Sequence, residues 1–94
     1  MVTMDLVIKN GAVATGSGAA VIDVGIEDGQ IAQLGGTMRA SQSIDAKGMF
    51  VLPGGVDPHV HLTPPRTGPG ENSWADNFEI GTRAALAGGV TTVG

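Results

Sequence analysis

The chain has 94 residues, enough for one small domain, since a domain near this size buries only about 60 to 65% of its unfolded surface. Hydrophobic residues make up 41% and charged residues 15% of the chain, a balance typical of folded soluble proteins. The formal net charge is -4 with only 5 Lys and Arg residues, which argues against nucleic acid as a partner. Because there is no cysteine, disulfides and thiolate metal sites are excluded, and any metal must bind His, carboxylate or modified side chains.

The first ten residues give no targeting signal. Asp5 interrupts their apolar run and no small-residue cleavage site follows, so neither a signal peptide nor a membrane span is indicated. We therefore expect a cytoplasmic protein without a membrane partner.

Short strands and tight turns are predicted from the N-terminus onward. The apolar run 5–9, the pair Asn10-Gly11 and residues 12–14 are typical of a hairpin with a two-residue type I′ turn. After a break at Gly16-Ser17-Gly18, residues 22–27 alternate between apolar and other residues, which predicts a half-buried strand.

Asp28-Gly29 then predicts a second hairpin turn, with residues 31–34 as the partner strand. A polar stretch, residues 37–43, leads to a turn at Lys47-Gly48 and an apolar strand over residues 49–52. Everything before Pro53 is predicted to be an antiparallel meander without a helix. We expect an architectural boundary near Pro53.

The second half of the chain has a different pattern. Residues 56–62 are predicted to form a strand, and the loop 63–74 holds prolines and glycines that exclude a helix or a central strand. Ser73, with Asp76 three residues later, resembles a capping box at a helix start. The predicted elements that follow are a helix with Phe78, Thr82, Ala85 and Leu86 on one face, its end at Gly88-Gly89, and a strand over residues 90–93. Strand, loop, helix and strand in this order predict a βαβ unit, in which ligands gather at the carboxyl ends of strands.

His59 and His61 are the only histidines of the chain and lie near the carboxyl end of the predicted strand 56–62. Residues two apart in a strand face the same side, so the two imidazoles can share one divalent ion such as zinc. The remaining ligands would have to come from elsewhere. A bare His-x-His pattern also occurs by chance or as a surface pair.

Three blocks of the chain resemble one family. Residues 51–62, Val-Leu-Pro-Gly-Gly-Val-Asp-Pro-His-Val-His-Leu, closely resemble the first barrel strand of the cyclic amidohydrolases, which include hydantoinases, dihydropyrimidinases, allantoinases and dihydroorotases. Residues 75–93 are similar to the helix and second strand of that family, and residues 5–11 to its opening strand. Together the three blocks cover nearly the whole chain.

The resemblance implies a mostly β chain made of two truncated parts. Residues 1–52 would be a portion of a β-sandwich domain, and residues 53–94 the first strand, the helix and the start of the second strand of a (β/α)8 TIM-barrel domain. Because such a barrel takes about 250 residues, the 94 residues are expected to be inactive alone.

The chemistry implied by the resemblance is hydrolysis of the C–N bond of a cyclic amide or ureide. Two divalent metals, usually zinc, would be bridged by a carboxylated lysine outside this chain, with His59 and His61 binding one of them. A metal-bridging hydroxide would attack the ring carbonyl, and an aspartate on a later strand would move the proton. No catalytic residue is therefore expected within this chain, and the family suggests a homotetramer.

The substrate class depends on the residue two positions after the second histidine. Dihydroorotases have an arginine there that binds a substrate carboxylate, whereas this chain has Thr63, with Arg66 nearby in the loop. Hydantoinase or dihydropyrimidinase activity is therefore ranked above dihydroorotase and allantoinase activity.

Three further residues have competing interpretations. Asp57 could orient a ligand histidine, but an Asp before Pro favours a local turn. Trp74 could stack on a substrate ring, but its place beside a helix start favours packing. Arg83 is expected to be solvated. Two alternatives to an enzyme also stay open: a non-catalytic dihydropyrimidinase-like scaffold and a free-standing β-sandwich binding module.

Overall fold

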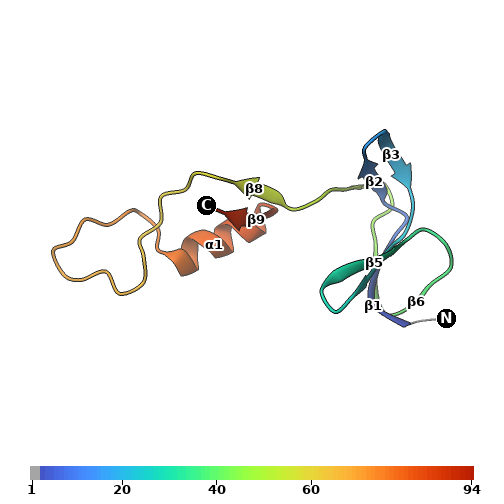
Figure 1. The fold of residues 1–94 in the computed structure, drawn as a ribbon, viewed down its shortest axis with the longest axis horizontal. Coiled ribbons are helices and arrows are strands. Elements are labelled where there is room, and N and C mark those ends of the chain that lie inside the picture. Colours follow the sequence, from blue (N-terminus) through green and yellow to red (C-terminus); the bar gives the residue numbers. More distant parts are fainter. Residues whose placement is uncertain (1–2) are drawn as a thin grey trace. The chain divides into compact units, whose positions relative to one another are not determined.

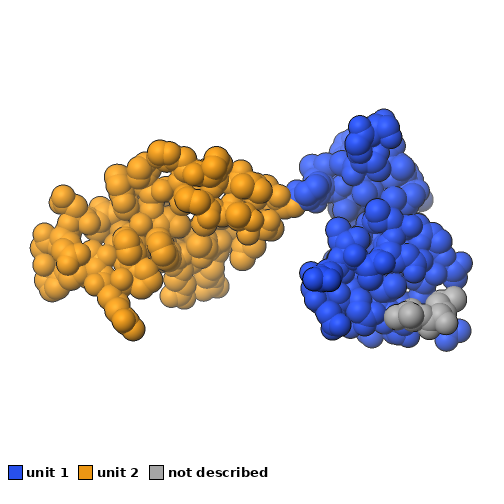
Figure 2. All heavy atoms as spheres, in the orientation of Figure 1, with its two compact units in different colours: residues 1–53 blue, residues 54–94 orange. Residues whose placement is uncertain are grey.

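The computed structural model describes residues 3–94. Within this range the chain is mostly β with one short helix, as the sequence predicted. It divides into two compact units, Met1–Pro53 and Gly54–Gly94, which Figure 2 shows in different colours.

The first unit holds two sheets (Figure 1). The four-stranded sheet has the order β5-β4-β1-β6 and consists of β1 (Thr3–Lys9), β4 (Val24–Glu27), β5 (Gln30–Leu34) and β6 (Arg39–Asp45). The three-stranded sheet has the order β3-β2-β7 and consists of β2 (Ala12–Thr15), β3 (Gly18–Val21) and β7 (Phe50–Val51).

The hairpin predicted at Asp28-Gly29 is confirmed. Strands β4 and β5 pair antiparallel, with Glu27 opposite Gln30. Asp28 and Gly29 have φ values of 51° and 72°, and a type I′ turn needs a positive φ at both central residues. The turn at Lys47-Gly48 is confirmed too, since Met49 N donates to Ala46 O at 2.9 Å.

The hairpin predicted at Asn10-Gly11 was wrong, because β1 and β2 lie in different sheets. Asn10 has the expected positive φ of 65°, but its polar groups bond elsewhere: its backbone N–H donates to Asp23 Oδ1 at 3.0 Å and its side-chain amide to Asp45 Oδ1 at 3.1 Å. A Cβ at Gly11 would collide with the side chain of Val51. The pair therefore makes a tight corner between two sheets.

The antiparallel meander predicted before Pro53 was also wrong. Strand β6 pairs parallel with β1, and β7 pairs parallel with β2. The polar sequence of β6 gave no strand signal, since nearly all its side chains are exposed. Strand β3 was missed because Gly16-Ser17 was interpreted as a break, whereas Thr15 and Gly18 are paired around it in a hairpin.

The core of the first unit is small. Among the described residues, Met4, Val7, Val24 and Ala46 are the buried apolar ones, and Val7 is fully buried. Glycine allows close packing here, because a Cβ at Gly25 would lie 2.8 Å from the sulfur of Met38. The large apolar side chains that stay exposed in this unit are Val21, Ile31, Leu34, Ile44, Met49, Phe50 and Leu52.

The second unit is a βαβ unit, as predicted. It consists of β8 (Gly55–Asp57), α1 (Phe78–Ala87) and β9 (Val90–Val93), with β8 and β9 paired parallel (Figure 1). The loop 63–74 contains neither helix nor strand, apart from one isolated bridge at Thr63. Within residues 3–94, no helix combines the length and the hydropathy needed to cross a lipid bilayer.

Helix α1 starts later than predicted. Its N-cap is Asn77, whose side chain accepts a hydrogen bond from Ile80 N at 2.8 Å, so the start expected at Ser73 was wrong. An Asn side chain satisfies one of the free N–H groups of the first turn. The helix ends as predicted, with the cap at Gly88 and a left-handed φ of 89° at Gly89.

The apolar face predicted for the helix is confirmed. Phe78 and Thr82 line a cavity of about 350 Å³ together with Val93. Ala85 and Leu86 line a neighbouring hollow with β9. One face of α1 is therefore turned toward the two-stranded sheet.

Replacing Val7 with Ala tests the small core. The change removes two buried carbons, so the free energy of unfolding should fall by about 2 kcal/mol, transfer and cavity terms together. Urea denaturation measures it. Val21→Ala, at a side chain 71% exposed, is the matched control and should change stability by less than about 0.5 kcal/mol. Equal losses in both variants would contradict the assignment of the core.

Asn10 should set the acidity of Asp45. The pKa of the Asp45 carboxyl lies below its ordinary value of 3.8, mainly because the Asn10 amide donates to it and then because the Lys47 backbone N–H does. A lowered folded pKa stabilises the fold above pH 3.8, and this contribution is lost as the pH falls below that value. Asn10→Gly keeps the positive φ without the amide, so a pH titration by NMR should show the Asp45 pKa rising. An unchanged pKa would remove this role from Asn10.

Candidate metal centre

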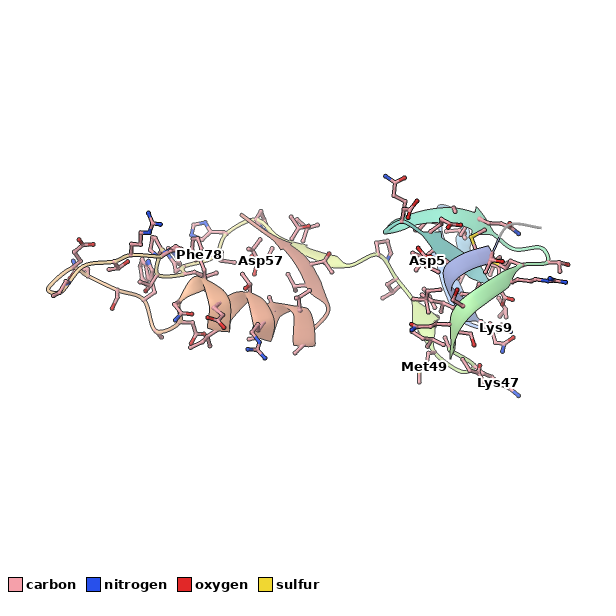
Figure 3. All side chains as sticks on the ribbon, turned by 90° about the horizontal axis from the view of Figure 1, so that it is seen from below. Asp5, Lys9, Lys47, Met49, Asp57 and Phe78 are labelled. Atoms are coloured by element: carbon pink, nitrogen blue, oxygen red, sulfur yellow. The ribbon has the colours of Figure 1, made fainter. Side chains whose placement is uncertain are left out.

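The strand that carries the histidines is shorter than predicted. A strand was expected over residues 56–62, but β8 ends at Asp57. Pro58 has no N–H to donate to a neighbouring strand, and the N–H of His59 donates to Asp57 Oδ1 at 3.2 Å. This Asx turn confirms the local-turn interpretation of Asp57, which Figure 3 places at the end of β8.

The chain beyond Asp57 nevertheless stays beside β9. Gly94 N donates to Asp57 O at 2.9 Å, and Val60 N donates to Gly94 O at 3.2 Å. The two partners of Gly94 are thus three residues apart, where a regular parallel ladder uses residues two apart, so one extra residue is inserted as in a bulge. Bulges re-aim side chains and are common near active sites.

Alternation of side chains survives this irregularity. Val60 and Leu62 are half-buried and line the cavity with Phe78 of α1. His59 and His61 are exposed. The apolar residues thus pack against the helix and the sheet, which leaves the two histidines together on the opposite side.

The two imidazoles converge on each other. Their Nε2 atoms lie 3.1 Å apart, and their ring centroids are 4.9 Å apart with an interplanar angle of 64°. Two nitrogens bound to one tetrahedral zinc at about 2.0 to 2.1 Å lie roughly 3.3 Å apart. The donor atoms therefore have the type and the spacing that a shared divalent ion requires.

The rest of a ligand set is not found nearby. Among the described residues, no third His, Asp or Glu side chain joins the pair within ligating distance. Within residues 3–94, the one triple of such groups is Asp5, Glu27 and Asp28, whose oxygens lie within 4.8 Å of one another. Asp28 N donates to Asp5 Oδ2 at 2.8 Å, which accounts for the approach of these two residues.

Trp74 lies against the second histidine. The ring centroids of His61 and Trp74 are 4.2 Å apart with a tilt of 45°. The Thr63 hydroxyl holds the backbone of Trp74 on both sides, since it accepts from Trp74 N at 2.7 Å and donates to Trp74 O at 3.1 Å. Packing was predicted for Trp74, but its partner was not.

Among the described residues, neither arginine considered from the sequence hydrogen-bonds to a histidine. Arg83 is solvated as expected, with 79% of its side chain exposed and a 3.9 Å contact to Glu79 one turn away. Arg66 lines a hollow with Thr63 and Asn77, and neither histidine contributes to that lining.

Sequence comparison and structure comparison both match this chain to D-hydantoinases. The chain is 46% identical to D-hydantoinase of Rhizobium radiobacter over 91 residues, 96% of the chain. It is 47% identical to allantoinase of Bacillus licheniformis over 89 residues, 94% of the chain. A solved structure of D-hydantoinase matches 96% of the chain with a TM-score of 0.84 and 44% identity. The chain spans about 19% of the length of each. No family model matches it.

We expect Asp57 to position His59 through the hydrogen bond of the Asx turn rather than through its negative charge. Asp57→Ala removes the acceptor for the His59 N–H, so the dissociation constant for zinc should rise about three- to tenfold, the equivalent of one hydrogen bond. Asp57→Asn keeps an acceptor oxygen and should bind zinc nearly as the wild type does. Calorimetric titration measures both. If the Asn variant lost as much as the Ala variant, the charge and not the turn would be the cause.

Proposed function

We propose that this chain carries the first two metal ligands of an enzyme that hydrolyses cyclic amides or ureides. The premise is that the chain belongs to the cyclic amidohydrolase family of the D-hydantoinases and allantoinases. The observation that carries this proposal is the 3.1 Å approach of the Nε2 atoms of His59 and His61. They follow β8 in a βαβ unit, and the carboxyl end of a strand is where such folds place their active sites.

His59 and His61 would hold one divalent metal, which we propose to be zinc. Neutral imidazole suits zinc, and a catalytic zinc site needs further ligands and an open position. When bound, the metal would polarise the amide carbonyl and lower the pKa of the attacking water. Asp57 would keep the His59 backbone in place through its turn.

The remaining parts of the active site would come from protein outside these residues. We propose that residues 1–52 contribute to a β-sandwich domain and that residues 53–94 begin a TIM barrel. The rest of the barrel would bind a second metal, and it would supply the bridging carboxylated lysine and the proton-shuttling aspartate. The 94 residues alone would open no ring. We propose a cytoplasmic homotetramer for the complete enzyme.

Exposed apolar surface in the second unit supports the proposal that a larger barrel packs around it. In the second unit, Val56, Phe78 and Leu86 are 68%, 45% and 61% exposed, and the cavity beside Phe78 is lined mainly by apolar side chains. Contiguous exposed apolar surface usually marks a place where more protein packs. A free-standing binding module would leave this surface in water.

Thr63 supports a substrate without a carboxylate at that position. Dihydroorotases would need an arginine there, whereas the hydroxyl of Thr63 is engaged with both polar backbone groups of Trp74. We therefore propose a hydantoin or dihydropyrimidine ring as substrate. Allantoin is the next choice, because the identity to an allantoinase is as high as that to a D-hydantoinase.

A segment exchange tests the function. The matching segment of the Rhizobium radiobacter D-hydantoinase is replaced by this chain, and ring opening of hydantoin, dihydrouracil and allantoin is measured. The chimera should open hydantoin, and His59→Ala should lower kcat/KM by more than about a hundredfold, because the metal contributes several kcal/mol of charge stabilisation. Arg83→Ala, at an exposed position on α1, is the control and should change nothing.

Two results would contradict the proposal. A folded, metal-loaded chimera that opens no ring would favour the non-catalytic scaffold. Full activity of the His59→Ala chimera would remove this histidine from the metal site.

A further inference from the structure

We infer that Trp74, held in place by Thr63, is a positioning residue that fixes the His61 ring for metal binding. The inference rests on the proposed metal site at His59 and His61. It assigns a role to the loop residue whose ring packs against His61.

Two hydrogen bonds with the Thr63 hydroxyl fix the backbone of Trp74. A single hydroxyl accepts from Trp74 N at 2.7 Å and donates to Trp74 O at 3.1 Å. The backbone N–H of Thr63 also donates to Asp76 O at 2.9 Å. The two ends of the loop are thus joined directly beside His61, which lies two residues before Thr63.

The indole then limits the freedom of the His61 ring. The second side-chain torsion of histidine is broad and roughly two-fold, so an exposed imidazole can turn its Nε2 away from a metal. The indole packs against the imidazole at a tilt of 45°, with the ring centroids 4.2 Å apart. The ring edge carrying Nε2 stays directed at His59, 3.1 Å away.

The packing of Trp74 against His61 takes the place of the hydrogen bond that usually orients a ligand histidine. Ligand histidines usually donate their second ring N–H to a carboxylate, a carbonyl or water, which sets the ring orientation. Within residues 3–94, the ring of His61 hydrogen-bonds only to His59. Aromatic packing against Trp74 is therefore the orienting contact that the described residues supply.

Zinc titration by calorimetry tests the inference in the D-hydantoinase chimera that carries this chain, at about pH 7.5, where free imidazole is mostly neutral. Trp74→Ala should weaken zinc binding about tenfold, as the loss of an orienting group does. Trp74→Phe keeps a flat ring and should stay within about threefold of wild type. Thr63→Val removes only the hydroxyl and should weaken binding about three- to tenfold.

Thr67→Val is the matched control. Its hydroxyl donates to Pro64 O at 2.8 Å within the same loop, and among the described residues it makes no hydrogen bond to Trp74, so zinc binding should not change. Circular dichroism records whether each variant keeps its fold. If the Trp74→Ala variant unfolds, zinc binding by the Thr63→Val and Trp74→Phe variants tests the positioning role instead.

The outcomes separate this inference from the proposed function. If the wild-type chimera binds no zinc, or binds it as tightly after His59→Ala, the proposed metal site fails and the inference fails with it. If zinc binding needs both histidines but is unchanged in Trp74→Ala and Thr63→Val, only the positioning role is overturned. Equal weakening in Thr67→Val would also overturn it, since the cause would then be a looser loop.

Discussion

Parallel pairing of β8 with β9 is the constraint on which the candidate site depends. It fixes the backbone from Gly55 onward, and Gly94 extends the contact as far as Val60. Because side chains alternate along an extended chain, the burial of Val60 and Leu62 against α1 leaves His59 and His61 together on the other side. The convergence of the two imidazoles is thus a consequence of apolar packing on the opposite face.

Local signals in the sequence were enough for the element order of the second unit and for two turns of the first, Asp28-Gly29 and Lys47-Gly48. Asp28-Gly29 and Gly88-Gly89 supply positive φ where the chain needs it, so the β4–β5 hairpin and the end of α1 were predicted correctly. The sheet order of the first unit depends instead on pairing between distant segments. Asn10-Gly11 has the residues of a hairpin turn, but parallel pairing with β6 and β7 places β1 and β2 in separate sheets.

The candidate site was predictable in part. The spacing of His59 and His61 gave the shared face, although the strand ends earlier than its pattern suggested, because Pro58 and the Asx turn of Asp57 interrupt the ladder. The contact between Trp74 and His61 could not be predicted, since it depends on how the loop closes through the hydroxyl of Thr63. A threonine directly after the segment 56–62 carries no pattern that indicates such a role.

X-ray absorption at the zinc edge, on the zinc-loaded chain, is the most direct test of the central claim that His59 and His61 share one metal ion. The geometry predicts two imidazole nitrogens at about 2.0 to 2.1 Å from the zinc, with one of them lost in His61→Ala. Zinc surrounded by oxygen alone would contradict the account, as would a spectrum that keeps both imidazoles in that variant.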